Sequence, residues 1–245
     1  MDMKTKRLLL PLVLSSVLAV SSAWAADDHG GEVKPEPYAV GKTMTKAVQA
    51  SITPEQAITI LKNGNTRFSA GKAITPDYKK QITQTALGQY PLASVVSCID
   101  SRSAPELVFN QGIGDLFTAR VAGNTVNEDI LGSLEYAAKV AGSRAIVVLG
   151  HTSCGAIKGA CDNVKMGNLT GLLDKLMPAV NATKTTGERN SHNHEFVQDV
   201  AELNVQQTVE KIRQMSPILK EMEEQGKIKI VGAMYNTSNG QVTWY

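Results

Sequence analysis

Cysteine is scarce in this sequence, and neither sign of charge is in excess. The 245 residues include three cysteines, too few for a small domain held together by disulfides. The formal net charge of +2 gives no indication of a nucleic-acid or membrane-surface partner. With 42% apolar and 20% charged residues, the composition also excludes a disordered, a collagen-like or a polytopic membrane protein. The length suffices for one sizeable domain or two small ones.

The first 25 residues have the three parts of an export signal. A basic start at residues 4–7 precedes an apolar run from Leu8 to Val20, and Ala23-Trp24-Ala25 places small residues where signal peptidase reads them. The run is too short for a convincing transmembrane helix. We therefore expect a signal peptide over residues 1–25, export to the periplasm, and no stable membrane insertion after cleavage. An odd number of cysteines in an oxidising compartment means that some thiols have a role other than disulfide pairing.

The mature chain alternates strand-like and helix-like segments. Residues 26–50 are polar and rich in glycine and proline, which predicts a flexible lead-in before a single domain over residues 51–245. Helices are predicted from Thr53, as N-cap of Pro54, and over 129–140, 155–164 and 195–215; strands are predicted over 92–99, 115–119, 144–149, 227–235 and 241–244. Ser103 and Glu106 are spaced as a capping box for a further helix. This alternation indicates an α/β fold with a mainly parallel central sheet flanked by helices.

Chemically distinctive side chains follow two of the predicted buried strands. Cys98, Asp100 and Arg102 follow the first strand, and His151 and Cys154 follow another. Ligand sites in open α/β sheets form at the carboxyl ends of the strands, so neighbouring strands would bring these side chains together. Two thiolates and one imidazole form a zinc-preferring set, and three protein ligands leave the fourth position that catalytic zinc sites keep open. Asp100 either binds this metal or stands beside it.

The same residues also allow plainer explanations. Cys98 and Cys154 could form a disulfide or be two buried thiols, and His151 could be a hydrogen-bonded histidine at a strand end. Each explanation would be preferred for one residue alone. The joint occurrence at two strand ends favours a metal site.

The spacing of the two segments resembles the signature of the β-class carbonic anhydrases, Cys-x-Asp-x-Arg followed by His-x-x-Cys. Here His151 lies 53 residues after Cys98. The resemblance runs from about Pro54 to the C-terminus and includes a hairpin from Tyr235 to Gly240. It implies an N-terminal helical arm, a C-terminal edge hairpin, and one zinc ion per chain.

This resemblance also implies roles for single residues. Zinc is expected on Cys98, His151 and Cys154. Asp100 is expected as a switchable fourth ligand that pairs with Arg102 when the site is open, and both are expected to be catalytic.

The resemblance further implies a substrate pocket made of Gln89, Phe117, Ala122, Tyr136 and Gly155. Ala122 stands where the family has a pocket valine. Plain core packing is the alternative for the two aromatic residues.

The implied activity is the zinc-dependent reversible hydration of carbon dioxide to bicarbonate and a proton. Hydrolysis of carbon disulfide or carbonyl sulfide on the same scaffold, or a non-catalytic protein that binds zinc or bicarbonate, are the alternatives. A homodimer or a tetramer is expected from the resemblance, and no nucleic-acid partner is expected.

Overall fold

The computed structural model describes residues 38–245, which belong to one compact unit. The predicted export signal over residues 1–25 and the first part of the expected lead-in lie outside these described residues. Within them, no helix has both the length and the hydropathy needed to cross a bilayer.

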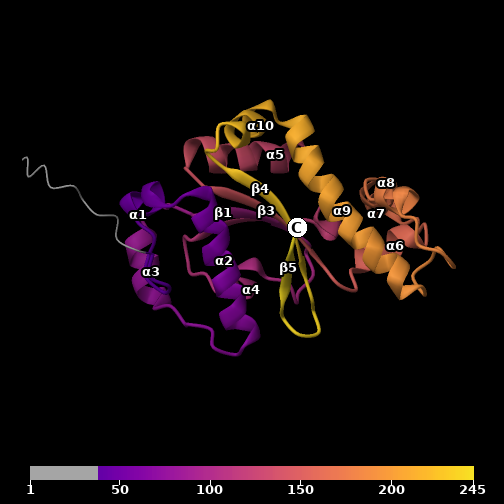
Figure 1. The fold of residues 1–245 in the computed structure, drawn as a ribbon, viewed down its shortest axis with the longest axis horizontal. Helices are drawn as coiled ribbons and strands as arrows, with labels where there is room; N and C mark the ends of the chain where they lie inside the picture. Colours follow the sequence, from indigo (N-terminus) through magenta and orange to yellow (C-terminus); the bar gives the residue numbers. More distant parts are fainter. Residues whose placement is uncertain (1–37) are drawn as a thin grey trace, which may run out of the picture. The chain divides into compact units, whose positions relative to one another are not determined.

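The strands of the described chain form one five-stranded sheet in the order β2-β1-β3-β4-β5 (Figure 1). They are β1 (Ala93–Ser97), β2 (Leu116–Arg120), β3 (Ala145–His151), β4 (Lys229–Tyr235) and β5 (Val242–Trp244). The first four are parallel to one another, and β5 pairs antiparallel with β4. The predicted mainly parallel sheet with an edge hairpin is therefore confirmed.

Helices cover both faces of this sheet. They are α1 (Lys46–Ser51), α2 (Pro54–Ser69), α3 (Tyr78–Thr85), α4 (Pro105–Val108), α5 (Glu128–Glu135), α6 (Gly155–Cys161), α7 (Gly167–Asp174), α8 (Met177–Ala182), α9 (His194–Met215) and α10 (Pro217–Glu224), with a 3-10 turn η1 (Ala122–Asn124) and a π-helical turn η2 (Tyr136–Val140). Side chains alternate along β1, so Val96 joins the core under α5, α9 and α10 while Val95 joins the core under α2 and α4. The central strands β1 and β3 are thus buried on both sides, as expected for parallel strands.

Helix α2 begins as its sequence predicts. Thr53 accepts a hydrogen bond from the Gln56 backbone, the Gln56 side chain accepts one from the Thr53 backbone, and Pro54 takes the first helical position. On its inner face, Asn65 donates to the Val108 and Gly240 carbonyls and accepts from the Val242 backbone. This one buried amide therefore attaches the C-terminal hairpin to the body of the fold.

Two glycines of the sheet face the long helix α9. A Cβ on Gly150 of β3 would lie 2.5 Å from Val205 Cγ2, and a Cβ on Gly232 of β4 would lie 2.7 Å from Val205 Cγ1. No side chain other than hydrogen fits at either position without movement. Val205 therefore packs α9 against Gly150 near the end of β3 and against Gly232 in the middle of β4.

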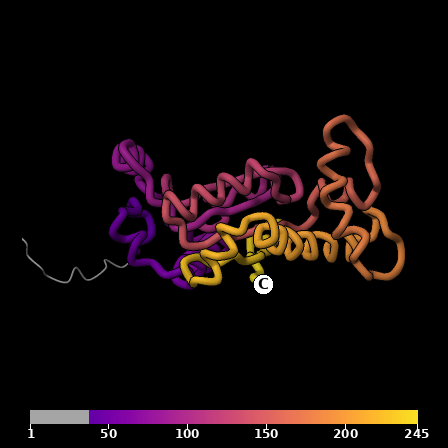
Figure 2. The backbone as a smooth tube through the Cα atoms, turned by 90° about the horizontal axis from the view of Figure 1, so that it is seen from above, coloured from indigo at the N-terminus to yellow at the C-terminus, as the bar shows by residue number. Residues whose placement is uncertain are grey.

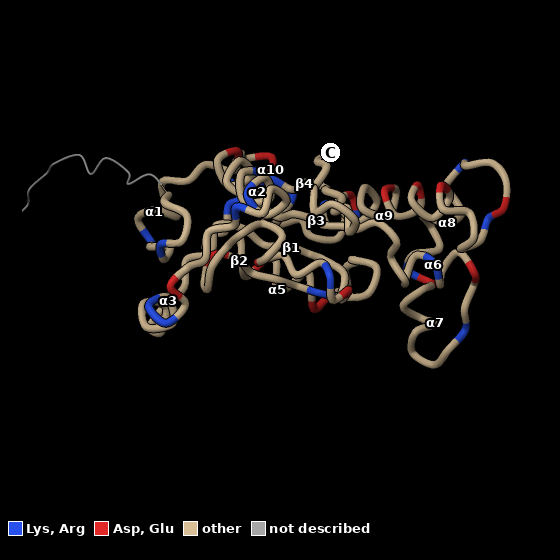
Figure 3. Tube along the Cα trace, turned by 90° about the horizontal axis from the view of Figure 1, so that it is seen from below, with Lys and Arg blue, Asp and Glu red and all other residues tan. Residues whose placement is uncertain are grey.

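Helices α6, α7 and α8 form a group beyond the carboxyl end of β3, and α9 runs from this group back along the sheet (Figures 1 and 2). Basic and acidic residues are interspersed over most elements (Figure 3). Helix α6 of this group contacts η1, and both lie at the sheet edge where the chemically distinctive residues follow their strands.

Two local expectations differ from the structure. The expected lead-in overlaps α1, where Gln49 is buried and donates to the Pro91 and Ala141 carbonyls, so ordered chain begins before residue 51. The capping box is wrong: α4 has no side-chain cap, because the Ser103 hydroxyl donates to the Asp100 carbonyl and Glu106 accepts from Thr118 instead.

Candidate metal centre

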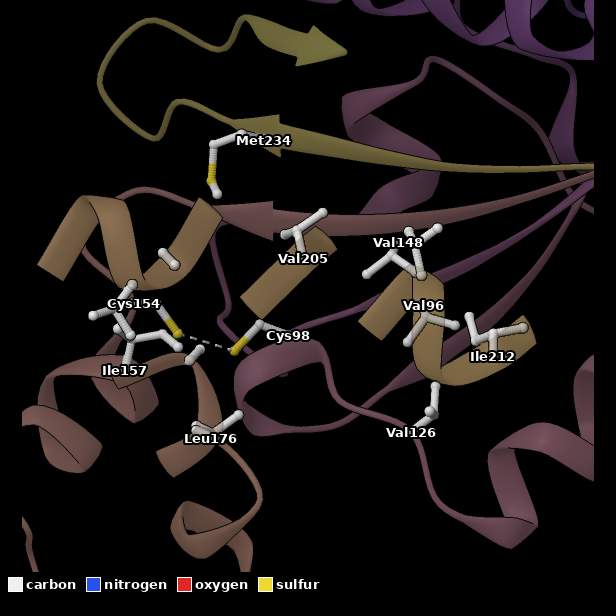
Figure 4. Close-up of a cluster of buried hydrophobic side chains, with 14 of the residues drawn as sticks. Val96, Cys98, Val126, Val148, Cys154, Ile157, Leu176, Val205, Ile212 and Met234 are labelled. Atoms are coloured by element: carbon white, nitrogen blue, oxygen red, sulfur yellow. Dashed lines mark hydrogen bonds between the residues drawn. The ribbon is translucent and has the colours of Figure 1, made fainter. Parts of the chain in front are cut away.

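Three potential metal ligands converge at the carboxyl ends of β1 and β3. The parallel register pairs Ser97 with Leu149, so Cys98 and His151 end up side by side, and Cys154 returns to them at the start of α6. Their ligand atoms all lie within 4.8 Å of one another, and all three residues are buried. The two sulfurs point toward each other at 4.0 Å, among Ile157, Leu176 and other apolar side chains (Figure 4).

The donor atoms of this cluster fit a zinc ion. His151 Nδ1 lies 2.9 Å from the Thr152 carbonyl oxygen, so it carries the proton and donates, which leaves Nε2 as the acceptor atom. That Nε2 is buried and finds no hydrogen-bond partner among the residues described. A buried acceptor without a partner is costly, and a metal ion at this point would satisfy it. Both cysteines are free thiols, so the alternative of a Cys98–Cys154 disulfide is not what the structure contains.

Asp100 stands beside the cluster and is held by Arg102. The Arg102 guanidinium donates from Nε to Oδ1 at 2.9 Å and from Nη2 to Oδ2 at 2.8 Å, and the Arg102 backbone donates to Oδ1 at 2.9 Å. These hydrogen bonds hold the pKa of the Asp100 carboxyl well below its usual range. Oδ2 lies 3.9 Å from His151 Nε2, which leaves an ionised oxygen facing the ligand cluster.

Backbone contacts fix the loop that carries these residues. Arg120, the last residue of β2, donates from Nε to the Cys98 carbonyl at 2.9 Å and from Nη2 to the Asp100 carbonyl at 2.6 Å. Ser103 donates to the same Asp100 carbonyl. Sequence reasoning did not assign Arg120 or Ser103 a part in the site. The position of Arg120 at a strand end was the signal that could have identified it.

The two thiols share one environment. The Gly123 backbone N–H donates to Cys98 Sγ at 3.5 Å. Hydrogen bonding with Cys154, the largest cause, and with this Gly123 N–H lowers the pKa of the Cys98 thiol, against the effect of burial. Coordination by a metal ion would deprotonate both thiols.

The residues expected to form the substrate pocket lie in two separate places. Gly155 begins α6 directly after Cys154, and Ala122 lies in η1 against α6, so both are close to the ligand cluster. Gln89 is exposed in the loop before β1, at the opposite end of that strand from Cys98.

Phe117 and Tyr136 are also away from the metal ligands. Phe117 pairs with Ser94 near the start of β1, and its ring lies 6.2 Å from that of Tyr136 in an edge-to-face arrangement. The two rings line a cavity of about 640 Å³ between β2 and α5, which none of the three ligands borders. One chain thus brings the ligands together with Asp100, Arg102, Ala122 and Gly155, but not with Gln89, Phe117 or Tyr136.

Comparison with known proteins gives one consistent family. Residues 93–242 match the family model described as carbonic anhydrase. Carbonic anhydrase 2 of Mycobacterium tuberculosis is 35% identical over 197 residues, covering 77% of this chain and 91% of that protein. The solved β-carbonic anhydrase CcaA is 25% identical, with a TM-score of 0.60 over 77% of this chain and 87% of that one.

A further solved structure is that of tetrameric β-carbonic anhydrases from the ascomycete Sordaria macrospora. It has a TM-score of 0.60 at 23% identity and covers 74% of this chain and 93% of that one. At this level of identity, the similarity shows the fold alone. The family model covers more than half of the chain and lies over the strands that carry the ligand cluster. With a relative at 35% identity aligned over most of its length, this chain belongs to the β-class carbonic anhydrases.

Proposed function

We propose that this protein catalyses the reversible hydration of carbon dioxide to bicarbonate and a proton, with zinc held by Cys98, His151 and Cys154. The observation that carries the proposal is the convergence of these three donor atoms within 4.8 Å, with the buried His151 Nε2 otherwise unsatisfied. Zinc in such a site supplies a Lewis acid that lowers the pKa of coordinated water toward neutrality.

Asp100 orients the water that attacks. Its Oδ2 faces the ligand cluster, and Arg102 holds the carboxylate ionised, so the oxygen accepts a hydrogen bond from the attacking water. A lone pair of that water is then aligned toward the substrate carbon. Because Arg102 keeps the pKa of Asp100 low, the carboxylate acts as an acceptor and does not retain the proton. The Arg102 side chain is half exposed, so the released proton has solvent close by.

The purified protein tests this proposal by carbon dioxide hydration in stopped flow, with zinc content measured on the same sample. We expect about one zinc per chain, and Cys98→Ala to lose metal and activity together. Full activity in a zinc-free sample would contradict the proposal. Assays with carbonyl sulfide and carbon disulfide on the same sample distinguish the alternative hydrolase, and zinc binding without turnover of any of these would indicate a non-catalytic protein.

A homodimer or a tetramer is part of the proposal. Gln89, Phe117 and Tyr136 are expected pocket residues, yet in one chain they lie at the opposite end of the sheet from the ligands. A second copy would let these residues reach a neighbouring metal centre, and the Sordaria macrospora relatives are described as tetrameric. Light scattering at micromolar concentration tests this, and a monomer would contradict it.

We also propose that the protein is exported to the periplasm. The support is the order of basic, apolar and small residues over positions 1–25. N-terminal sequencing of protein recovered from a bacterial periplasmic fraction should begin at Ala26. Protein that stays in the cytoplasm with residues 1–25 attached would overturn this proposal.

A further inference from the structure

We propose that Asn204 is a positioning residue of the metal centre, because its side-chain amide fixes the backbone turn whose N–H binds the Cys98 sulfur. The inference rests on zinc binding at the proposed site but not on the identity of the substrate. It follows from one chain of contacts that begins on α9 and ends at a metal ligand.

Asn204 is a polar residue on the buried face of α9. It is 3% exposed, and the buried residues next to it on that face include Val200, Val205 and Thr208. A buried amide requires hydrogen-bond partners, and Asn204 Nδ2 donates to the Gly123 carbonyl at 2.9 Å. This bond joins α9 to η1, which are far apart in the sequence.

The approach of α9 to the sheet makes this bond possible. Val205, the next residue along the helix, packs into the space left by Gly150 and Gly232. Val205 and Cys98 belong to the same cluster of buried side chains (Figure 4). The helix therefore lies close enough to η1 for the Asn204 side chain to reach the Gly123 carbonyl.

The turn that Asn204 holds contains two successive residues with positive φ. Gly123 has φ +75°, and the next residue, Asn124, has φ +42° while being buried. Two successive left-handed residues are uncommon and persist where surrounding contacts fix them. Leu176 closes the other side, since a Cβ on Gly123 would lie 2.7 Å from its Cδ1.

The N–H of Gly123 donates to Cys98 Sγ at 3.5 Å. Such a bond orients the sulfur toward the point where the three ligand atoms converge. Groups that support metal ligands in this way typically change metal affinity by about 10- to 100-fold when they are removed. Asn204 acts through one further hydrogen bond, to the Gly123 carbonyl, so we expect its removal to lower zinc affinity by about 10-fold, at the lower end of that range.

The test compares Asn204→Leu with Thr208→Val. The first variant keeps a side chain of similar size but removes the donor to Gly123. The second removes a buried polar group one turn along the same helix, with no bond to Gly123. Zinc affinity is measured by chelator competition, and the thiolate-to-metal charge-transfer band is recorded after cobalt substitution.

We expect Asn204→Leu to bind zinc about 10-fold more weakly and to shift the cobalt band, whereas Thr208→Val changes neither. Unchanged zinc affinity and an unchanged band in Asn204→Leu would overturn the inference. Wild-type protein that binds no zinc at all would contradict the proposed function instead, so the two failures are distinguishable.

A second measurement does not depend on whether Asn204→Leu folds. In wild-type protein loaded with an NMR-active cadmium isotope, the Gly123 amide proton should show scalar coupling to the metal through the Cys98 sulfur. The absence of that coupling, in a sample where the cysteine protons do couple to cadmium, would also overturn the inference.

Discussion

Asp100 is the residue whose replacement best separates metal binding from catalysis. Asp100→Asn keeps the size of the side chain but removes the ionised oxygen that faces the ligand cluster. We expect zinc to be retained and kcat/KM for carbon dioxide hydration to fall by about 10²-fold or more, since the hydrogen-bond acceptor that orients the attacking water is lost. Stopped-flow assays and metal analysis of the same preparation check both parts.

Arg102→Lys is the matched comparison for that variant. Lysine keeps the positive charge but cannot reproduce the two parallel guanidinium hydrogen bonds, so we expect reduced activity with zinc retained. If Asp100→Asn instead lost zinc as readily as Cys98→Ala, Asp100 would be a metal ligand in the resting protein.

The two thiols should form a disulfide when zinc is absent. Cys98 Sγ and Cys154 Sγ are 4.0 Å apart, and a small movement brings them to bonding distance. We expect oxidation of the metal-free protein to give an inactive Cys98–Cys154 bridge, which peptide mapping by mass spectrometry detects. Bound zinc should prevent it, because the metal occupies both sulfurs.

Cys161 provides the control for this oxidation. It is buried in the core two turns along α6 from Cys154 and is not part of the ligand cluster. Cys161→Ser should leave both zinc binding and the oxidation unchanged, and a bridge that includes Cys161 would contradict the prediction.

At the scale of the elements, the packing of α9 on β3 depends on the absence of a Cβ atom at Gly150. Gly150→Ala would place a Cβ 2.5 Å from Val205 Cγ2 and 2.9 Å from Met234 Cε. We expect the free energy of unfolding to fall by about 1–3 kcal/mol, because the helix must move away from the sheet. Urea unfolding followed by circular dichroism measures the change.

Gly171→Ala is the control, since Gly171 lies in α7 with no atom within 4 Å of the added Cβ. There the substitution should be neutral or raise stability by up to about 1 kcal/mol, through helix propensity. Equal destabilisation by both variants would show that the packing of Val205 is not the cause.

Elements with a strong apolar period could be predicted, and short ones could not. The buried runs that became β1 and β3, and the cap at Thr53, follow from local chemistry alone. Helix α10 was not predicted, although Ser216 caps it and Pro217 begins it, because its eight residues are too few to establish a helical period from the sequence alone.

The same division applies to the site. Cys98 and His151 could be brought together because parallel strands share a carboxyl edge. Asn204 could not be assigned, because its role depends on how closely α9 approaches η1, which only tertiary packing determines. The separation of Gln89 from the ligands could have been anticipated from the sequence. Gln89 lies nine residues before Cys98, which places it beyond the start of the short strand that Cys98 follows.

Across the whole molecule, one buried carboxyl should make stability depend on pH. Asp115 is fully buried directly before β2. Its Oδ2 accepts hydrogen bonds from the Gly112 backbone at 2.7 Å and from the Tyr38 hydroxyl. Its Oδ1 has no hydrogen-bond partner among the residues described. Burial raises its pKa to about 6. The folded state therefore holds this proton more tightly than the unfolded state, where the pKa is about 3.9.

Stability from this group is present below about pH 4, falls as the pH rises to about 6, and is constant above that. The expected loss is about 3 kcal/mol, and Asp115→Asn should remove it. Urea unfolding of metal-free wild type and variant from about pH 4 to about pH 7 measures the difference. Parallel stability curves for the two proteins would contradict the prediction.

The placement of the ligands on two neighbouring strands also makes the metal a thermodynamic cross-link. Cys98 and Cys154 are 56 residues apart, so an ion that binds both joins segments that the unfolded chain leaves separate. Because the unfolded chain does not preform this site, free zinc at about 100 times its dissociation constant adds about 2.7 kcal/mol to the free energy of unfolding. The melting temperature then becomes a function of the free zinc concentration around the protein, and scarcity of the metal would reduce the stability of the fold as well as its activity.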